Sequence, residues 1–314
     1  MVAEGLHRRV AADEAGQRFD RWVRRHFPDL PYGAVMKLVR TGQFRLDGRR
    51  VTPDTRIAAG QMVRIPPQLA LERAGRRPER HLSEADRRFV RGLVRHADDD
   101  ILILEKPAGL AVQGGPKTRR HLDGLLAALA EGGERPRLVH RLDRDTAGVL
   151  VLARHLVAAR ALMEAFRHQR VEKIYWAVVL GRPPRAEGVI DIPLGKAGPR
   201  GEARMTPDAP EVRRAVTGYR VLARAADRAA WLELRPHTGR THQLRAHCAL
   251  LGCPVMGDAK YGDPATWPAG APRGLMLQAM AIAFPHPRTG RIFRFALPRP
   301  APHLEAALRF WGLR

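Results

Sequence analysis

Two segments of the chain concentrate side chains that could perform acid–base or nucleophilic chemistry. In residues 137–154, RLVHRLDRDTAGVLVLAR, Asp143 and Asp145 precede a turn and a continuous apolar run, which predicts a fully buried strand. Such a strand holds the preceding turn rigidly, and the flanking Arg141 and Arg144 favour an ionised carboxylate. The alternative, which spacing alone favours, is an acid that only caps the backbone of its own turn.

The second segment, residues 235–247 (RPHTGRTHQLRAH), predicts a turn and then a helix that begins near Thr241. Arg245 shares a face of this helix with His242 and two alanines, and an arginine beside small residues can approach a carboxylate bidentately. A surface arginine in an arginine-rich protein fits equally well. In a third segment, EKIYWAV, Tyr175 opens a predicted strand, where a tyrosine that merely packs at the rim is the commoner case.

Other chemistries lack the residues that they need. Ser83 is the only serine and lies in a predicted linker, which excludes a serine nucleophile on a tight elbow. Neither a phosphate-binding GxxxxGK(S/T) loop nor a dinucleotide glycine fingerprint is present. Histidines and cysteines cluster in residues 237–253, but His242 and His247 are five residues apart, about 140° around a helix. That spacing disfavours a shared metal, so we expect no metal site.

The composition indicates a basic protein of two domains that binds a polyanion. The 314 residues include 55 Lys and Arg against 32 Asp and Glu, a net charge of +23, and 45% are apolar, enough for a sizeable core. Genome bias can raise arginine, but it does not explain why acids fail to balance it. RNA or DNA is the partner that such an excess favours.

Features of targeting and redox chemistry indicate the compartment. No apolar run approaches the roughly 18–20 residues of a membrane span, and the N-terminus lacks the apolar region of a secretory signal. Cys248 and Cys253 provide no disulfide framework. We therefore expect a cytoplasmic protein with no membrane partner.

The elements that must position these residues fall into two domains. Residues 17–66 predict two helices, a hairpin over QFRLDGRRV with an Asp-Gly turn, and a strand over GQMVRIP. We place this small α+β unit at 1–70 and a linker, with one helix at most, at 71–96. Short apolar strands mixed with helices near 120–131, 155–168 and 240–251 predict an α+β domain over 97–314. Basic residues crowd the first unit: Arg18, Arg21, Arg24, Arg25, Lys37, Arg40, Arg45, Arg49 and Arg50.

Several motifs of the second domain resemble the signature of the RluA-type pseudouridine synthases. They are ILILEKPAGLAVQGG, HRLDRDTAGVLVLAR, EKIYWAVVLG, PHTGRTHQLRAH with GDAKYGD, and AIAFPHPRTGRIFRFALP, in the family's order. Residues 17–66 resemble the S-four RNA-binding module that many members carry in front. HRLDRDT and the GG after LAVQ are most similar to the RluC type, which acts on large-subunit ribosomal RNA. The resemblance implies a mixed or antiparallel-sheet catalytic domain preceded by a small α+β RNA-binding module.

The resemblance also implies roles for individual residues. Asp143 matches the essential aspartate that breaks the glycosidic bond, Arg245 the arginine that pairs with it, and Tyr175 the tyrosine that packs on the flipped uracil. Arg141 matches the residue that fills the gap left by the extruded base. We expect further RNA contacts from His140 and Thr146 beside it and, in the first unit, from Arg18, Arg24, Arg25, Lys37 and Arg40.

The resulting hypothesis is an isomerase, acting as a monomer, that converts uridines to pseudouridine in large-subunit ribosomal RNA. Detaching uracil, turning it and rejoining it through carbon 5 calls for base flipping and requires no metal or redox cofactor. Two alternatives stay open at this point: a transfer RNA synthase of the same family, and a non-catalytic RNA-binding factor of ribosome assembly.

Overall fold

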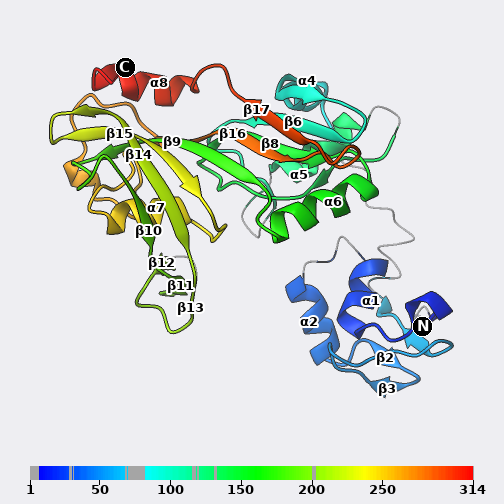
Figure 1. Cartoon of the computed structure of the whole chain (residues 1–314). Coiled ribbons are helices and arrows are strands. Elements are labelled where there is room, and N and C mark those ends of the chain that lie inside the picture. The colour runs from blue at the N-terminus through cyan, green and yellow to red at the C-terminus, as the bar shows by residue number, and fades with distance from the viewer. Residues whose placement is uncertain are drawn as a thin grey trace. The chain divides into compact units, whose positions relative to one another are not determined.

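The structure is a computed structural model that describes residues 7–27, 30, 32–67, 69, 82–114, 118, 120–130, 133–199 and 203–313. The chain divides into two compact units, residues 1–81 and 82–314, which are treated separately below (Figure 1). In these described ranges, none of the helices has the length and apolar character that crossing a bilayer would take.

The first unit packs two helices against a small antiparallel sheet. Helix α1 (Phe19–His26) buries Phe19, Trp22 and Val23, the face that its apolar spacing predicts. Helix α2 (Tyr32–Arg40) buries Val35 and Val39 against the same core. The sheet has the order β1-β4-β2-β3. Its strands are β1 (His7–Arg9), β2 (Arg45–Leu46), β3 (Arg49–Arg50) and β4 (Met62–Arg64).

The hairpin predicted for this unit is confirmed by its turn geometry. Strands β2 and β3 pair antiparallel across Asp47 and Gly48, whose φ angles are 48° and 76°. Two consecutive residues with positive φ give the turn a twist that matches the flanking strands, and Asp-Gly is a sequence that tolerates both. The local sequence therefore determines this hairpin.

The segment expected as a linker is shorter than predicted. Residues 70–81 lie outside the described residues, but residues 82–96 belong to the second unit. They form α4 (Glu84–Gly92), whose N-cap Ser83 accepts a hydrogen bond from the Asp86 amide, and the first strand, β5 (Val94–Ala97). The many charges of α4 lie on its exposed side and hide a narrow apolar face, which buries Val90.

The second unit is built on a ten-stranded mixed sheet, which confirms the predicted α+β class. Its main order is β10-β14-β15-β9-β16-β8-β6-β5, with β17 paired to β16 and β7 to β8. Strand β16 runs parallel to β8, and the remaining neighbours are antiparallel. Besides β5 the strands are β6 (Ile101–Lys106), β7 (Arg137–Leu138), β8 (Ala147–Ala153), β9 (Glu172–Leu180), β10 (Glu187–Asp191), β14 (Val216–Ala225), β15 (Ala229–Pro236), β16 (Leu277–Pro285) and β17 (Ile292–Ala296).

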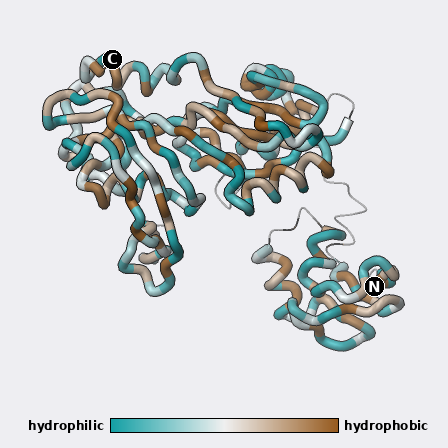
Figure 2. The backbone as a smooth tube through the Cα atoms, viewed as in Figure 1, coloured by the Kyte–Doolittle hydropathy of each residue, from teal (hydrophilic) through white to brown (hydrophobic). Residues whose placement is uncertain are grey.

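Helices cover the sheet at the three places where the sequence predicts them. They are α5 (Leu122–Leu125) continued by a short 3-10 turn, α6 (Leu156–Arg167) and α7 (Gln243–Leu250). A further helix that the sequence analysis did not identify, α8 (Pro302–Phe310), follows the last strand (Figure 1). Apolar residues gather along the central strands (Figure 2), because β8 is buried along its whole length.

A small separate sheet projects from one end of the second unit. Strands β11 (Leu194–Ala197), β12 (Arg204–Thr206) and β13 (Val212–Arg213) form an arm below β10 and β14 in Figure 1. Strand β11 is central and pairs with both others. The arm contacts the functional site described next, through Met205 on β12.

Candidate active site

A cavity of about 510 Å³ opens where the loop before β8, the start of β9 and the turn before α7 meet. This volume is within the range of roughly 300–1,000 Å³ that small-molecule sites occupy. All six site residues predicted for the second unit line it: Asp143, Tyr175, Arg245, His140, Arg141 and Thr146. The structure thus brings together residues that are up to 105 positions apart in the chain.

The loop that carries Asp143 is fixed at both ends. On one side β8 is buried, and Gly148 (φ +111°) lies so close to β16 that an added Cβ would be 2.0 Å from the Ala279 carbonyl oxygen. On the other side the fully buried Lys106 donates to the carbonyl oxygen of Arg144 at 2.9 Å. The Asp143 carboxylate therefore projects from a rigid backbone, as the buried strand predicts.

The Asp143 side chain does not cap its own turn. Its carboxylate makes no hydrogen bond within the described residues and has a side-chain exposure of 20%. Arg144, expected to favour its ionised form, pairs instead with Asp145 at 3.0 Å. The acid is thus open to the cavity, and its nearest cation comes from α7.

Arg245 lies near Asp143 but is held by another acid. Its Nε and Nη2 donate to both oxygens of Asp258 at 2.6 and 2.7 Å, whereas its Nη1 is 3.8 Å from Oδ2 of Asp143. The bidentate geometry expected for Arg245 is therefore present, with a different partner. Asp258 orients the guanidinium, and the third nitrogen faces the candidate catalytic acid.

Asp258 is well suited to this role because it is buried and fully engaged. It also accepts hydrogen bonds from the backbone amides of Lys260 and Tyr261, at 3.0 and 3.2 Å. Burial alone would lower the pKa of Arg245. The hydrogen bond to Asp258 and the attraction of its carboxylate outweigh burial and raise that pKa. The Tyr261 ring lies under the guanidinium, 5.3 Å from it.

A second donor, His242, faces the same oxygen of Asp143. The Tyr261 hydroxyl accepts from the Met205 amide at 2.8 Å, so its own proton is available to Nδ1 of His242 at 3.1 Å. When the hydroxyl donates to it, Nδ1 is the acceptor, and Nε2 then carries the proton toward Oδ2 of Asp143 at 3.8 Å. Burial lowers the pKa of His242, which keeps this ring neutral.

His242 holds this position in a strained backbone conformation. It is the N-cap of α7 with φ 51° and ψ 18°, a left-handed geometry that residues other than glycine seldom adopt. Such strain persists only where the surroundings enforce it, and it is concentrated at functional sites. The sequence analysis placed His242 on the same helix face as Arg245. The structure shows that both side chains also face Oδ2 of Asp143.

Tyr175 is on β9, opposite the acid in the cavity. Burial, reinforced by the charge of Asp143, raises the pKa of the Tyr175 phenol, which therefore stays protonated. The half-buried ring lines the cavity and also packs against the core of the sheet. A planar aromatic ring in the lining of a cavity suits contact with another planar group.

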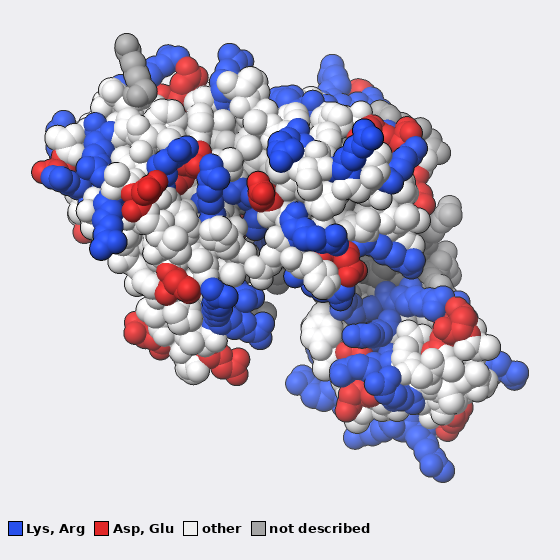
Figure 3. All heavy atoms as spheres, viewed as in Figure 1, with Lys and Arg blue, Asp and Glu red and all other residues white. Residues whose placement is uncertain are grey.

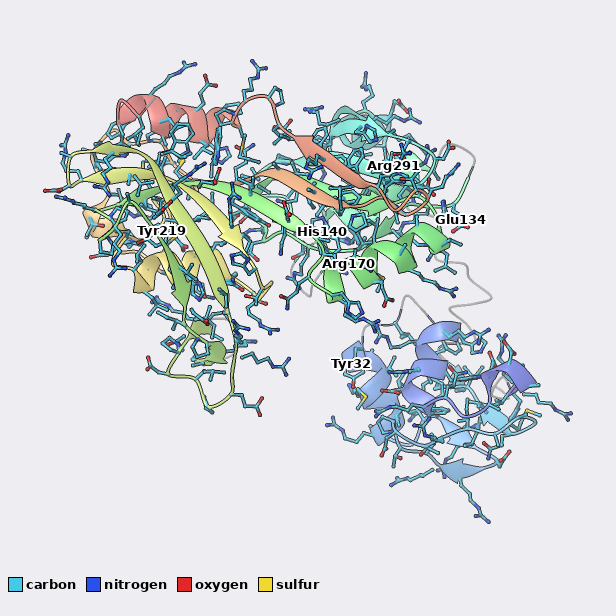
Figure 4. All side chains as sticks on the ribbon, viewed as in Figure 1. Tyr32, Glu134, His140, Arg170, Tyr219 and Arg291 are labelled. Carbon is cyan, nitrogen blue, oxygen red and sulfur yellow. The ribbon has the colours of Figure 1, made fainter. Side chains whose placement is uncertain are left out.

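The three neighbours predicted to contact RNA differ in their exposure. His140, which is labelled in Figure 4, has its ring stacked on that of Phe166, with centroids 4.7 Å apart, and its Nε2 accepts from the Val151 amide. Burial lowers the pKa of His140 to about 3. His140 is half-buried and Thr146 is buried, whereas Arg141 is exposed at the rim and lines an adjoining groove beside the arm.

The basic residues predicted in the first unit divide into two groups. Arg18 pairs with Asp20 at 3.1 Å and Arg25 with Asp13 at 2.9 Å. Exposed Arg24, Lys37 and Arg40 have no acidic partner in the described part of the chain. Lys and Arg predominate among the charged atoms on the visible face of this unit (Figure 3).

The histidines and cysteines considered for zinc have other roles. His247 bonds to Thr217 and to the Ile192 carbonyl, and both cysteines are buried with free thiols. Within the described ranges, the group whose spacing could suit a metal is Asp98, Asp100 and His286, at the opposite end of β6 from Lys106. Its carboxylates already bind Arg288, backbone amides and three histidines: His96, His155 and His286.

Residues that the sequence analysis did not select complete the site. Asp258 and Tyr261 lie in GDAKYGD, a motif quoted for its resemblance but given no role, and Lys173 lies two residues before Tyr175. Asp258 acts on Arg245, 13 positions away, and Tyr261 on His242, 19 positions away, and local spacing has no signal for such contacts. For Lys173 the sequence does hold a signal, because residues two positions apart on a strand point to the same face and Lys173 therefore accompanies Tyr175.

Comparison with known proteins agrees with this geometry. Residues 100–250 match the family model for RNA pseudouridylate synthase. The chain is 35% identical over 294 residues to ribosomal large subunit pseudouridine synthase C of Salmonella typhimurium, covering 92% of this chain and 91% of the relative. The protein of that name from Vibrio cholerae is 34% identical, with 95% and 94% covered. Among solved structures, human RNA pseudouridylate synthase domain containing 4 is 28% identical, covers 73% of this chain and 97% of its own, and has a TM-score of 0.60.

The mixed sheet, with an acid, an arginine and a tyrosine in one basic cavity, is the scaffold of an RNA-modifying enzyme. The chain belongs to the RNA pseudouridylate synthase family, and the expected resemblance to the RluA type is confirmed. It is accordingly an isomerase that forms pseudouridine in RNA.

Proposed function

We propose that this chain converts specific uridines of large-subunit ribosomal RNA to pseudouridine, with Asp143 as the catalytic acid group. The observation that carries the proposal is the Asp143 carboxylate, open to a basic cavity and faced by Arg245 and His242 on a single oxygen. The substrate class is supported by similarity over more than nine-tenths of the chain to large-subunit ribosomal RNA synthases.

The arrangement divides the work of the reaction between the two carboxylate oxygens. Arg245 and His242 stabilise negative charge on Oδ2 of Asp143, which leaves Oδ1 for the nucleoside. Asp143 breaks the glycosidic bond, uracil turns within the cavity, and its carbon 5 joins the ribose carbon that nitrogen 1 has left. Carbon 5 then gives its proton to a base in the site and nitrogen 1 takes up a proton, so that no atom is gained or lost overall.

Tyr175 and Arg141 hold the RNA during this step. The Tyr175 ring packs on the extruded uracil, and its protonated hydroxyl is available for a proton transfer. Arg141, exposed at the rim, occupies the space from which the base has left. Unstacking costs a few kcal/mol, which contacts between basic residues and phosphates offset. His140 and Thr146 shape the cavity around these groups.

The first unit serves as an RNA-binding module of the S-four type in this proposal. Its contribution comes from Arg24, Lys37 and Arg40, which are exposed and unpaired among the described residues, more than from Arg18 and Arg25. We assign residues 1–70 to this module and the chemistry to the domain that follows. Two buried thiols without a disulfide support a cytoplasmic location. A monomer suffices, because each site residue named above comes from one chain, and no metal is required.

The test is release of tritium from RNA labelled at uracil carbon 5. The protein is incubated with a large-subunit ribosomal RNA transcript and, separately, with pooled transfer RNA transcripts, and pseudouridines are mapped in both. We expect release and mapped sites in the ribosomal transcript alone. Release confined to transfer RNA would replace the substrate, and no release from either RNA would refute the proposed activity.

A further inference from the structure

Two lysines of the second unit, the buried Lys106 and the half-buried Lys173, differ in how their ammonium groups are satisfied. Lys106 donates to the carbonyl oxygens of Pro107, Leu110 and Arg144, each at 2.9 Å, and so uses all three of its N–H bonds. Lys173, on β9, makes neither a hydrogen bond nor an ion pair with any residue that the structure describes. Burial lowers the pKa of Lys173, and no carboxylate counteracts this effect.

Lys173 is placed to meet whatever occupies the cavity. It lines the cavity together with Asp143 and Tyr175. Side chains two positions apart on a strand point to the same face, about 6.6–6.8 Å from each other. Lys173 and Tyr175 therefore approach the same occupant at two points, one cationic and one aromatic.

The surroundings of Lys173 require an anion from outside. An unpaired charge in a partly buried position is costly for the free protein unless a partner arrives. Among the described residues that line the cavity Asp143 is the one acid, and it faces Arg245 and His242. The remaining charged residues of the lining are cations: Arg141, Arg167, Arg240 and Arg245.

We propose that Lys173 binds a phosphate of the RNA backbone next to the uridine that is modified. The assignment rests on the proposed function, in which uracil packs on Tyr175 and the glycosidic bond lies at Asp143. A nucleotide carries its base and its phosphates on different sides of the ribose. Tyr175 takes the base and Asp143 the glycosidic bond. The phosphate is therefore the part of the same nucleotide that is left for Lys173.

This site predicts opposite effects of one substitution on binding and on stability. Lys173→Met removes one phosphate contact, so the slope of log Kd against log salt concentration falls by about 0.7–0.9. We expect Kd to rise about 5- to 20-fold at 0.1 M salt. The melting temperature of the free protein rises by about 2–4 °C, because a half-buried charge without a partner is lost.

The experiment uses the full chain and a large-subunit ribosomal RNA transcript. Binding is measured by filter retention at salt concentrations from about 0.05 to 0.3 M, over which the release of counterions changes the affinity. Lys173→Arg keeps the charge and retains the wild-type slope. Arg224→Met removes an exposed charge on β14 outside the cavity and also retains it. Lys173→Gln is a second neutral variant that should repeat the Lys173→Met result.

The outcomes separate this site from the proposed function. A lower slope for both neutral variants, with the wild-type slope for Lys173→Arg, supports the phosphate site even if no pseudouridine forms. A wild-type slope for the neutral variants overturns the phosphate site. Any loss of rate in those variants would then come from contact with uracil or from a structural role of Lys173. A fall in melting temperature of the free protein would overturn the argument that Lys173 lacks a partner.

Discussion

The cations of the first unit and those of the cavity are in different physical states. Arg24, Lys37 and Arg40 are exposed and unpaired among the described residues, so salt screens them and their side chains move freely. Arg245 is desolvated and locked onto Asp258 by two short hydrogen bonds. The first kind of charge attracts RNA without fixing its geometry. The second kind is preorganised, and it is the kind that can stabilise charge in a transition state.

The comparison is tested most severely by removing the preorganised cation. Arg245→Met leaves Asp258 buried without its partner and deprives Asp143 of a donor, so we expect the single-turnover rate of tritium release to fall about 100- to 1,000-fold. RNA affinity should change less than about threefold, since Arg245 is held by Asp258, faces Asp143 and is assigned no phosphate contact. Arg224→Met, which removes an exposed arginine outside the cavity, serves as the control and should keep the wild-type rate.

Asp258→Asn asks whether the orientation of Arg245 matters apart from its charge. Breaking a buried ion pair from one side costs about 3–5 kcal/mol of unfolding free energy, which corresponds to a melting temperature lower by about 6–20 °C. We expect the rate to fall about 10- to 100-fold, because the guanidinium is still present but no longer fixed. In the Arg245→Met background the substitution should have little further effect on rate, and full additivity would contradict the orienting role.

Tyr261→Phe tests the proton arrangement of His242. Without the hydroxyl, Nδ1 loses its donor, so both neutral tautomers become accessible and Nε2 no longer carries the proton at all times. We expect a loss of about 3- to 10-fold in rate at unchanged RNA affinity. Imidazole nitrogen-15 shifts, assigned with His242→Asn, should report one tautomer in the parent and a mixture in the variant. One tautomer in both proteins would contradict the arrangement.

The smallest effect on rate is expected in the first unit. Replacing Arg24, Lys37 and Arg40 together by Gln should leave the single-turnover rate at saturating protein within about twofold of the parent. The slope of log Kd against log salt should fall by about 2–3 as the contacts are lost. As a control, Arg18→Gln removes a cation already paired with Asp20 and should lower the slope less than Arg24→Gln. A lower rate at saturating protein would show that the exposed cations of the first unit also affect the chemical step, which would contradict the comparison.

The sequence predicts those parts of the fold whose cause is local. The Asp-Gly hairpin, the buried β8 strand, α6 and α7 all follow from turn chemistry or apolar period. Helix α4 is the one helix that the predicted linker allowed, but its narrow apolar face concealed that it belongs to the second unit, and α8 was not identified. The strands agree with prediction more closely than the segments between them.

The candidate site is predictable in its membership but not in its contacts. The motifs place Asp143, Tyr175 and Arg245 in one cavity, as the structure does. That Asp258 takes the bidentate bond, and that Tyr261 sets the tautomer of His242, depends on how the chain returns to α7 after the helix has ended. Spacing along one helix carries no information about such a contact.

The central claim is that one carboxylate performs the chemistry while other groups bind the RNA. Asp143→Asn keeps the shape of the side chain and removes its charge, so the measurement is tritium release and RNA affinity for this variant and the parent under identical salt. The account predicts release below about one-thousandth of the parental rate, with Kd within about threefold. Release at the parental rate would contradict it.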